Sequence, residues 1–117
     1  MGICETKKKD NQSTFGTSIH TGIQPAFQLI GKGSGITPDK QNEIVSSAMS
    51  IIQNGLTPIG EKTGIKIKEK LGGDWLVIIR PKGKYIDFNI TLVKGNEYMA
   101  FILDNIKFDV IRIWINQ

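Results

Sequence analysis

Residues 67–79 read IKEKLGGDWLVII, and within them the hydrophobic pattern changes from the period of a helix to that of a strand. Before the two glycines, residues that suit an inward helix face recur every four positions: Ile59, Thr63, Ile67 and Leu71. Gly72 and Gly73 are typical of a helix end. The apolar run that opens at Trp75 and closes at Pro81 is typical of a buried strand. This stretch therefore predicts a helix followed directly by a strand.

Upstream, the sequence predicts a short strand and then another helix. Residues 26–33 (AFQLIGKG) read as a strand, because their apolar residues end at a glycine-rich break. Thr37 is a good N-cap, and Pro38 suits the first helical position, where its missing N–H costs nothing. Asn54 and Gly55 supply the stop. Between these signals we predict a helix with one apolar face, made by Ile44, Val45, Ala48, Met49, Ile51 and Ile52.

The start of the second helix shows the same signal, with Thr57 as N-cap and Pro58 at the first helical position. Gly60 and Gly64 lie inside this helix. Each weakens an isolated helix by roughly 1 kcal/mol relative to alanine.

Downstream of Pro81, three more strands are predicted at residues 84–93, 97–103 and 106–115. The first of them alternates cleanly between apolar and polar residues. The tripeptide KGN at 94–96 and the dipeptide DN at 104–105 read as turns.

In the last strand the apolar phase switches at Val110 and Ile111. A β-bulge would produce this switch, and so would a strand end that is apolar on both sides. The predicted fold class is α+β, with two helices packed on an antiparallel sheet of four to five strands.

Composition excludes several classes of protein. The 117 residues suit one domain, which we place at 26–117 behind a flexible tail at 1–25. One cysteine, Cys4, and one histidine, His20, allow neither an intramolecular disulfide nor a usual zinc site. A net charge of +4 is too small for the signature of a nucleic-acid-binding protein. We find no catalytic set, and we expect no enzyme activity and no cofactor.

Three stretches carry a resemblance to a known family: IKEKLGGDW at 67–75, KGKYI at 82–86 and YMAFIL at 98–103. In this order and spacing the chain resembles the dynein light chains of the small type that dimerises and binds short linear motifs. The stretches match the end of that family's second helix with its strand-opening tryptophan, its Gly-x-Tyr-Val strand start and its aromatic-rich penultimate strand. The resemblance covers about residues 26–114 and implies the fold of that family.

The resemblance also implies a site at which an extended partner peptide adds to a strand edge. Carried over to this chain, the strand edge consists of Gly83, Lys84, Tyr85, Ile86, Asp87 and Phe88. The opposite wall is the start of the second helix around Thr57, which in the family receives a glutamine of the partner. The chain's own Gly-Ile-Gln at 22–24 resembles an accepted motif, which gives the hypothesis that the tail occupies its own or a neighbour's groove.

Two departures from the family pattern leave open whether the chain forms the family's peptide groove and whether it is a dimer or a monomer. Pro58 lacks a backbone donor where the partner glutamine should dock. The segment from Tyr85 to Tyr98 is about five residues longer than its family counterpart, by an ungapped comparison of the flanking motifs. Family dimers exchange this strand between subunits, whereas a self-contained hairpin here would favour a monomer.

Basic residues gather around the second helix. From Lys62 to Lys84 there are seven of them against two acidic residues, Glu69 and Asp74. This pattern is typical of a solvated face, and it also suits a patch that attracts anionic lipid or an acidic partner.

The first six residues, MGICET, fit the myristoylation pattern M-G-x-x-x-[ST]. Gly2 would carry the myristate, and Cys4 is close enough to take a second acyl chain, which matters because stable anchoring needs two signals. Three lysines follow, but Glu5 and Asp10 offset most of their charge. The terminus therefore predicts lipidation at Gly2 and Cys4.

Together, the resemblance and the terminal motif imply a non-enzymatic adaptor or light chain on the cytoskeleton and the cytoplasmic face of a membrane. Its expected partners are peptides of a dynein intermediate chain-like or scaffold protein in a microtubule motor complex, a second copy of the chain, and a membrane reached through acyl chains. Nucleic acid is not expected. The alternative is a monomeric structural protein of a membrane-associated cytoskeleton without the peptide groove.

Overall fold

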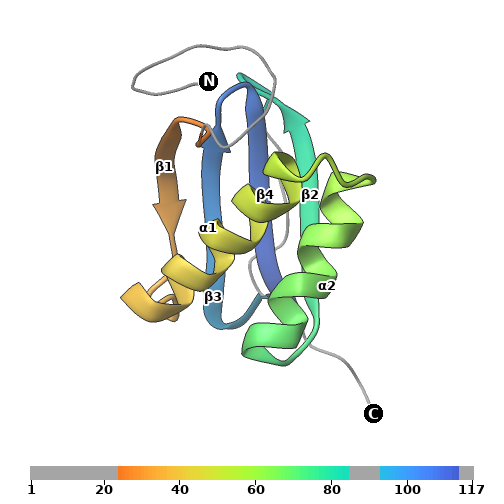
Figure 1. The fold of residues 1–117 in the computed structure, drawn as a ribbon. Helices are drawn as coiled ribbons and strands as arrows, with labels where there is room; N and C mark the ends of the chain where they lie inside the picture. Colours follow the sequence, from red (N-terminus) through yellow and green to blue (C-terminus); the bar gives the residue numbers. More distant parts are fainter. Residues whose placement is uncertain (1–23, 85–92, 114–117) are drawn as a thin grey trace.

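The computed structural model describes residues 24–84 and 93–113, in which two helices cover one face of a four-stranded antiparallel sheet (Figure 1). The elements are β1 (Phe27–Lys32), α1 (Pro38–Gln53), α2 (Ile59–Leu71), β2 (Trp75–Pro81), β3 (Val93–Leu103) and β4 (Ile106–Ile113). The strands lie in the order β1-β3-β4-β2, and every neighbouring pair is antiparallel. The predicted α+β class, with two helices packed on an antiparallel sheet, is confirmed. The described elements follow the predicted order apart from the strand predicted at 84–93, most of which lies outside the described residues.

Helix α1 forms between the predicted signals. The hydroxyl of Thr37 accepts a hydrogen bond from the backbone N–H of Lys40 at 3.2 Å, which satisfies one of the free donors of the first turn. At the other end, the side-chain amide of Asn54 donates to the carbonyl of Ser50 at 2.8 Å. The apolar face of the helix is buried on the sheet, with Ile44 fully inaccessible to solvent.

Helix α2 begins one residue later than the sequence predicts. Its N-cap is Pro58, and no side chain caps the helix, so the expectation that Thr57 acts as N-cap is wrong. The predicted inward row does include two buried residues, Thr63 and Ile67. At the far end, the indole N–H of Trp75 donates to the carbonyl of Gly72 at 2.7 Å, which joins the end of the helix to the start of β2.

The core lies between the helices and the sheet. Phe101 of β3 and Phe108 of β4 stack at its centre, with their ring centroids 5.0 Å apart and their planes 5° from parallel. Ile44 of α1 and Ile67 of α2 pack in the same cluster. Full burial of an aliphatic or phenylalanine side chain contributes roughly 1.5–3 kcal/mol, so this cluster is a major source of the domain's stability.

The predicted turn at residues 94–96 is wrong, because β3 continues through them. Gly95 and Asn96 do have positive φ, at 62° and 56°, but they form an irregular part of the strand. The register of β3 with β4 shifts between Val93 and Tyr98, which marks a bulge or other irregularity within the strand. Positive φ suits a turn and a bulge alike, so the residue types do not distinguish them. A hairpin that turns at 94–96 is therefore wrong, and most of the predicted strand at 84–93 lies outside the described residues.

The phase switch in the last strand does not mark a bulge in β4. Pairing of β4 with β2 runs without a shift from Ile106 to Arg112. Val110 packs in the core with the helices, while Ile111 faces the other side of the sheet and is only 3% exposed. The alternative interpretation, a strand end that is apolar on both sides, is correct.

Candidate functional site

The sheet has an open edge at β2. Each residue of β2 from Trp75 to Pro81 pairs with β4, and no strand within residues 24–84 and 93–113 pairs with the other edge. Helix α2 runs beside this strand (Figure 1). Leu76, which the sequence places in a buried strand, is 45% exposed. An unpaired strand edge offers backbone donors and acceptors to another chain.

Two glycines bring α2 close to β2. A Cβ atom added at Gly60 would lie 3.2 Å from Cγ1 of Ile79 and 3.3 Å from the carbonyl oxygen of Val77. One added at Gly64 would meet Cγ2 of Val77 at 3.5 Å, which is ordinary contact. Gly60 weakens the helix locally, but it allows the first turn of α2 to lie directly against β2.

The first turn of α2 presents free backbone donors. The first helical bond runs from the N–H of Lys62 to the carbonyl of Pro58 at 3.0 Å. The amides of Ile59, Gly60 and Glu61 precede it and have no acceptor in the described residues. The proline occupies the N-cap position, before the first helical residue. Its missing N–H therefore removes none of these three donors. Helix starts of this kind favour an oxygen acceptor.

The chain leaves β2 in a tight turn. The N–H of Lys82 donates to the carbonyl of Asn105 at 2.8 Å, and the N–H of Lys84 donates to the carbonyl of Pro81 at 3.1 Å. Gly83 has a φ of +91°, which strains any other residue.

Gly83 and Lys84 are thus exposed at the end of β2, beside the start of α2. Thr57, the predicted residue on the opposite wall, is exposed just before that helix, and its peptide bond to Pro58 is cis. The remaining predicted site residues lie outside the described residues: Tyr85, Ile86, Asp87, Phe88, Gly2 and Cys4.

The opposite edge of the sheet anchors the start of the described chain. The N–H of Ala26 donates to the carboxylate of Asp104 at 2.8 Å, and the N–H of Asp104 donates to the carbonyl of Ala26 at 2.9 Å. Gln24, two residues earlier, is held near β1, whereas the candidate site lies at β2. Gly22, Ile23 and most of the predicted strand edge lie outside the described residues, so the hypothesis that Gly-Ile-Gln occupies the chain's own or a neighbour's groove stays a prediction.

Sequence reasoning missed a buried carboxylate. Glu97 of β3 binds Nζ of Lys40 at 2.8 Å and Nη1 of Arg112 at 3.1 Å. The guanidinium of Arg112 also lies 5.8 Å from the centre of the Trp75 ring. This network joins α1, β3 and β4 to the start of β2. No local pattern could have revealed it, because its members come from distant parts of the chain.

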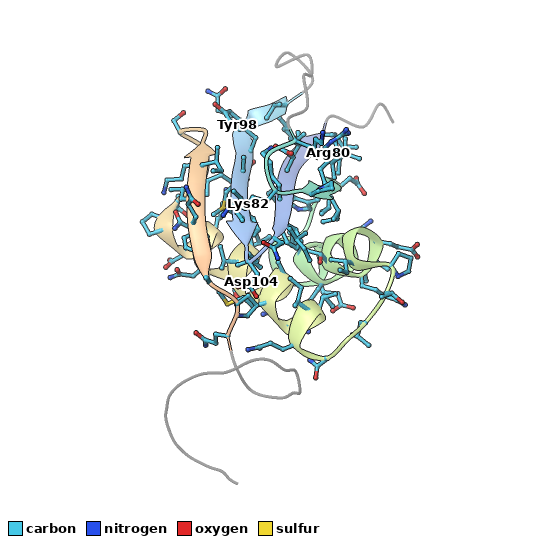
Figure 2. All side chains as sticks on the ribbon, turned by 90° about the horizontal axis from the view of Figure 1, so that it is seen from above. Arg80, Lys82, Tyr98 and Asp104 are labelled. Atoms are coloured by element: carbon cyan, nitrogen blue, oxygen red, sulfur yellow. The ribbon has the colours of Figure 1, made fainter. Side chains whose placement is uncertain are left out.

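A second ion pair lies on the face of the sheet away from the helices. Lys107 and Asp109 of β4 meet at 2.7 Å, and both side chains are more than nine-tenths buried. Their spacing of two residues places them on one face of the strand, which was the available signal. Figure 2 shows Arg80 and Tyr98 on this same side of the sheet.

Within the described residues, no group of three or more His, Cys, Asp and Glu side chains could hold a metal ion. None of the helices described is long and apolar enough to cross a membrane.

No protein-family model and no curated protein sequence matches the chain. Among solved structures, it is similar to the dynein light chain-like domain of the calcium-binding protein FhCaBP2 from Fasciola hepatica. The TM-score is 0.61 at 15% sequence identity, and the alignment covers 76% of this chain and 93% of that domain. The fold is therefore that of a dynein light chain-like domain.

Proposed function

We propose that this chain is a non-enzymatic adaptor that binds an extended segment of a partner protein by strand addition. The observation that carries the proposal is the open edge of β2 beside the three free amides that start α2. Backbone hydrogen bonds to a strand supply affinity in this mode, and side-chain pockets supply selectivity. The shared fold with a dynein light chain-like domain supports the same class of activity.

In this proposal the strand edge and the start of α2 form the two walls of the site, and each binds a different part of the partner. The open edge of β2 pairs with the partner, and the residues that follow β2 contact the partner at the end of that edge: Gly83, Lys84, Tyr85, Ile86, Asp87 and Phe88. The start of α2 near Thr57 receives an oxygen acceptor of the partner, such as a glutamine side-chain carbonyl. A dynein intermediate chain-like or scaffold peptide would provide both features. Such a partner places the chain on a microtubule motor complex or the cytoskeleton.

Two copies of the chain associate in the proposed form, as in the family it resembles. Light scattering at micromolar concentration should then give twice the mass of one chain. A stable monomer would contradict this assembly and favour the alternative of a structural protein without the groove.

The N-terminus tethers the adaptor to the cytoplasmic face of a membrane in this proposal. Its support is the sequence motif alone: Gly2 for myristate and Cys4 for palmitate. The intact mass of the protein from its native cell should exceed the calculated mass of the chain without Met1 by both acyl groups. An unmodified terminus would contradict the tether and leave peptide binding unaffected.

Strand addition can be tested with a labelled ten-residue peptide that has Gly-Ile-Gln at its centre, by fluorescence anisotropy. N-methylation of three alternate backbone amides that face the strand should weaken binding at least tenfold, since each lost hydrogen bond contributes about 1 kcal/mol. Methylation of the intervening amides is the matched control and should change affinity little. Replacing the glutamine by alanine should weaken binding about fivefold.

Equal loss for both methylated peptides would contradict strand addition. So would an absence of saturable binding across a set of glutamine-containing peptides of this length.

A further inference from the structure

Four basic side chains lie at one end of the described domain. Lys62 belongs to the first turn of α2, Arg80 to the end of β2, and Lys82 and Lys84 to the turn that follows. None of these four forms an ion pair within the described part of the chain. We refer to these residues as the basic end.

Packing places these cations together although they come from two elements. Gly60 lies against Ile79, which puts the first turn of α2 beside the last residues of β2. The backbone bond from Lys82 to Asn105 then joins the turn after β2 to the turn between β3 and β4. In Figure 1 this is the upper end of the molecule, and Figure 2 shows it from above, with Arg80 and Lys82 labelled.

The opposite end of α2 differs in its charge pairing. Lys68 binds Asp74 at 3.1 Å, and Lys70 binds Glu43 at 3.5 Å. At the basic end the nearby acids are Glu61 and Asp104, and Asp104 already accepts the N–H of Ala26. Within the described residues, Lys62 and Lys66 are the lysines of α2 that form no ion pair, and Lys62 lies at the helix start, the end that it shares with Arg80, Lys82 and Lys84.

The basic end also presents apolar side chains and receives the N-terminal segment. Leu56, in the loop before α2, is 44% exposed, and Phe27, at the start of β1, is 40% exposed. Residues 1–23 join the described domain at Gln24, next to Phe27. The chain that carries the proposed acylation sites therefore meets the domain at the same end as the cations.

We infer that the basic end sits on an anionic membrane, with its cations among lipid headgroups and Leu56 and Phe27 toward the acyl boundary. The inference extends the proposed tether, but its surface is separate from Gly2 and Cys4. Exposed cations beside exposed apolar residues are the features that interfacial binding uses. The cations lie on two sides of the domain: Arg80 is on the side of the sheet away from the helices, and Lys62 is on a helix. A membrane surface can contact both sides of this end at once, whereas a single acidic peptide suits a patch on one side. An acidic peptide is therefore the less suitable occupant.

The test uses the full chain without acyl groups, produced as Gly2→Ala, and vesicles of phosphatidylcholine with or without phosphatidylserine. At millimolar lipid, co-sedimentation should show stronger binding to the phosphatidylserine vesicles. Each cation near an anionic surface strengthens binding about fivefold, so Arg80→Glu with Lys82→Glu should lower the partition coefficient at least about 25-fold. Both residues are exposed and pack in no core cluster, so the fold tolerates the change.

The matched control is Lys68→Glu with Lys70→Glu, which changes the net charge equally at the other end of α2. This control should lower binding less than about threefold, because the altered charges lie away from the membrane. Equal losses for the two double variants would overturn the inference, as would indifference to phosphatidylserine. A chain that ignores these vesicles but binds poly-glutamate through Arg80 and Lys82 would assign the surface to an acidic partner instead. The acyl groups play no part in any of these outcomes, so the tether is tested separately.

Discussion

Glu97 of β3 joins three elements of the domain through its carboxylate. Its side chain is about nine-tenths buried and lies between Lys40 of α1 and Arg112 of β4. Hydrogen bonds between charged groups that are shielded from water are stronger than those at the surface. Because Arg112 also covers the ring of Trp75, the carboxylate fixes the point at which β2 begins.

Replacing Glu97 by glutamine should lower the free energy of unfolding by about 2 kcal/mol, because the neutral amide keeps the volume but leaves two cations poorly compensated. Urea unfolding monitored by tryptophan fluorescence measures this. Glu43→Gln is the control: its ion pair with Lys70 is long and partly exposed, and the loss of this pair should lower the free energy of unfolding by under about 0.5 kcal/mol. Equal effects would show that Glu97 is no more important than a surface acid.

At this scale the sequence predicts local features and misses distant ones. The cap of Thr37 on α1 follows from three neighbouring residues, and it forms. The partners of Glu97 depend on the folded arrangement of three elements, so no local pattern contains them. Thr57 lies between these cases: it has the residue type of a cap, but the helix starts after Pro58.

The packing of α2 on β2 is the element-scale feature on which the candidate site depends. Helix propensity alone marks Gly60 and Gly64 as weak points. In the fold they are the residues through which the helix approaches the strand, and their surroundings differ. Gly60 lies against a backbone carbonyl that cannot give way, whereas Gly64 has room for a methyl group.

Gly64→Ala should therefore raise the free energy of unfolding by about 0.5–1 kcal/mol, because alanine stabilises the helix and its Cβ makes ordinary contacts. Gly60→Ala gains the same propensity but forces the helix away from Val77 and Ile79. It should show a net loss of about 1 kcal/mol. Thermal and urea unfolding of both variants provide the comparison. Equal stabilisation by the two substitutions would mean that the helix does not lie this close to the strand.

The elements were largely predictable, and their irregularities were not. Period and end signals place α1, β1 and β2 to within about a residue and α2 one residue too early, because each element is decided by its own residues. The tripeptide at 94–96 was predicted as a turn, and only its pairing shows that it interrupts β3 without ending it. Gly33 and Gly35 explain the shape: their N–H groups donate to the carbonyls of Tyr98 and Asn96, an approach that leaves no space for a Cβ.

For the whole molecule, the sequence predicts the fold class, but only the structure shows which strands form the edges of the sheet. Two helices and an antiparallel sheet follow from the order of the elements. The strand order β1-β3-β4-β2 depends on long-range pairing. Within the described residues it leaves β1 and β2 as the two edges of the sheet, and β2 is the one that lies beside α2. At 15% identity the same fold occurs in a dynein light chain-like domain, so few of the residues at aligned positions need to be identical for this fold.

The central claim is that a partner peptide docks at β2 and the start of α2, and amide exchange measured by NMR tests it most directly. With the Gly-Ile-Gln peptide at saturation, exchange at Ile59, Gly60 and Glu61 should slow at least about fivefold, because an acceptor then occupies free donors. The amides of β1, at the far edge of the sheet, should not change. Unchanged exchange at the start of α2, or protection confined to β1, would contradict the account.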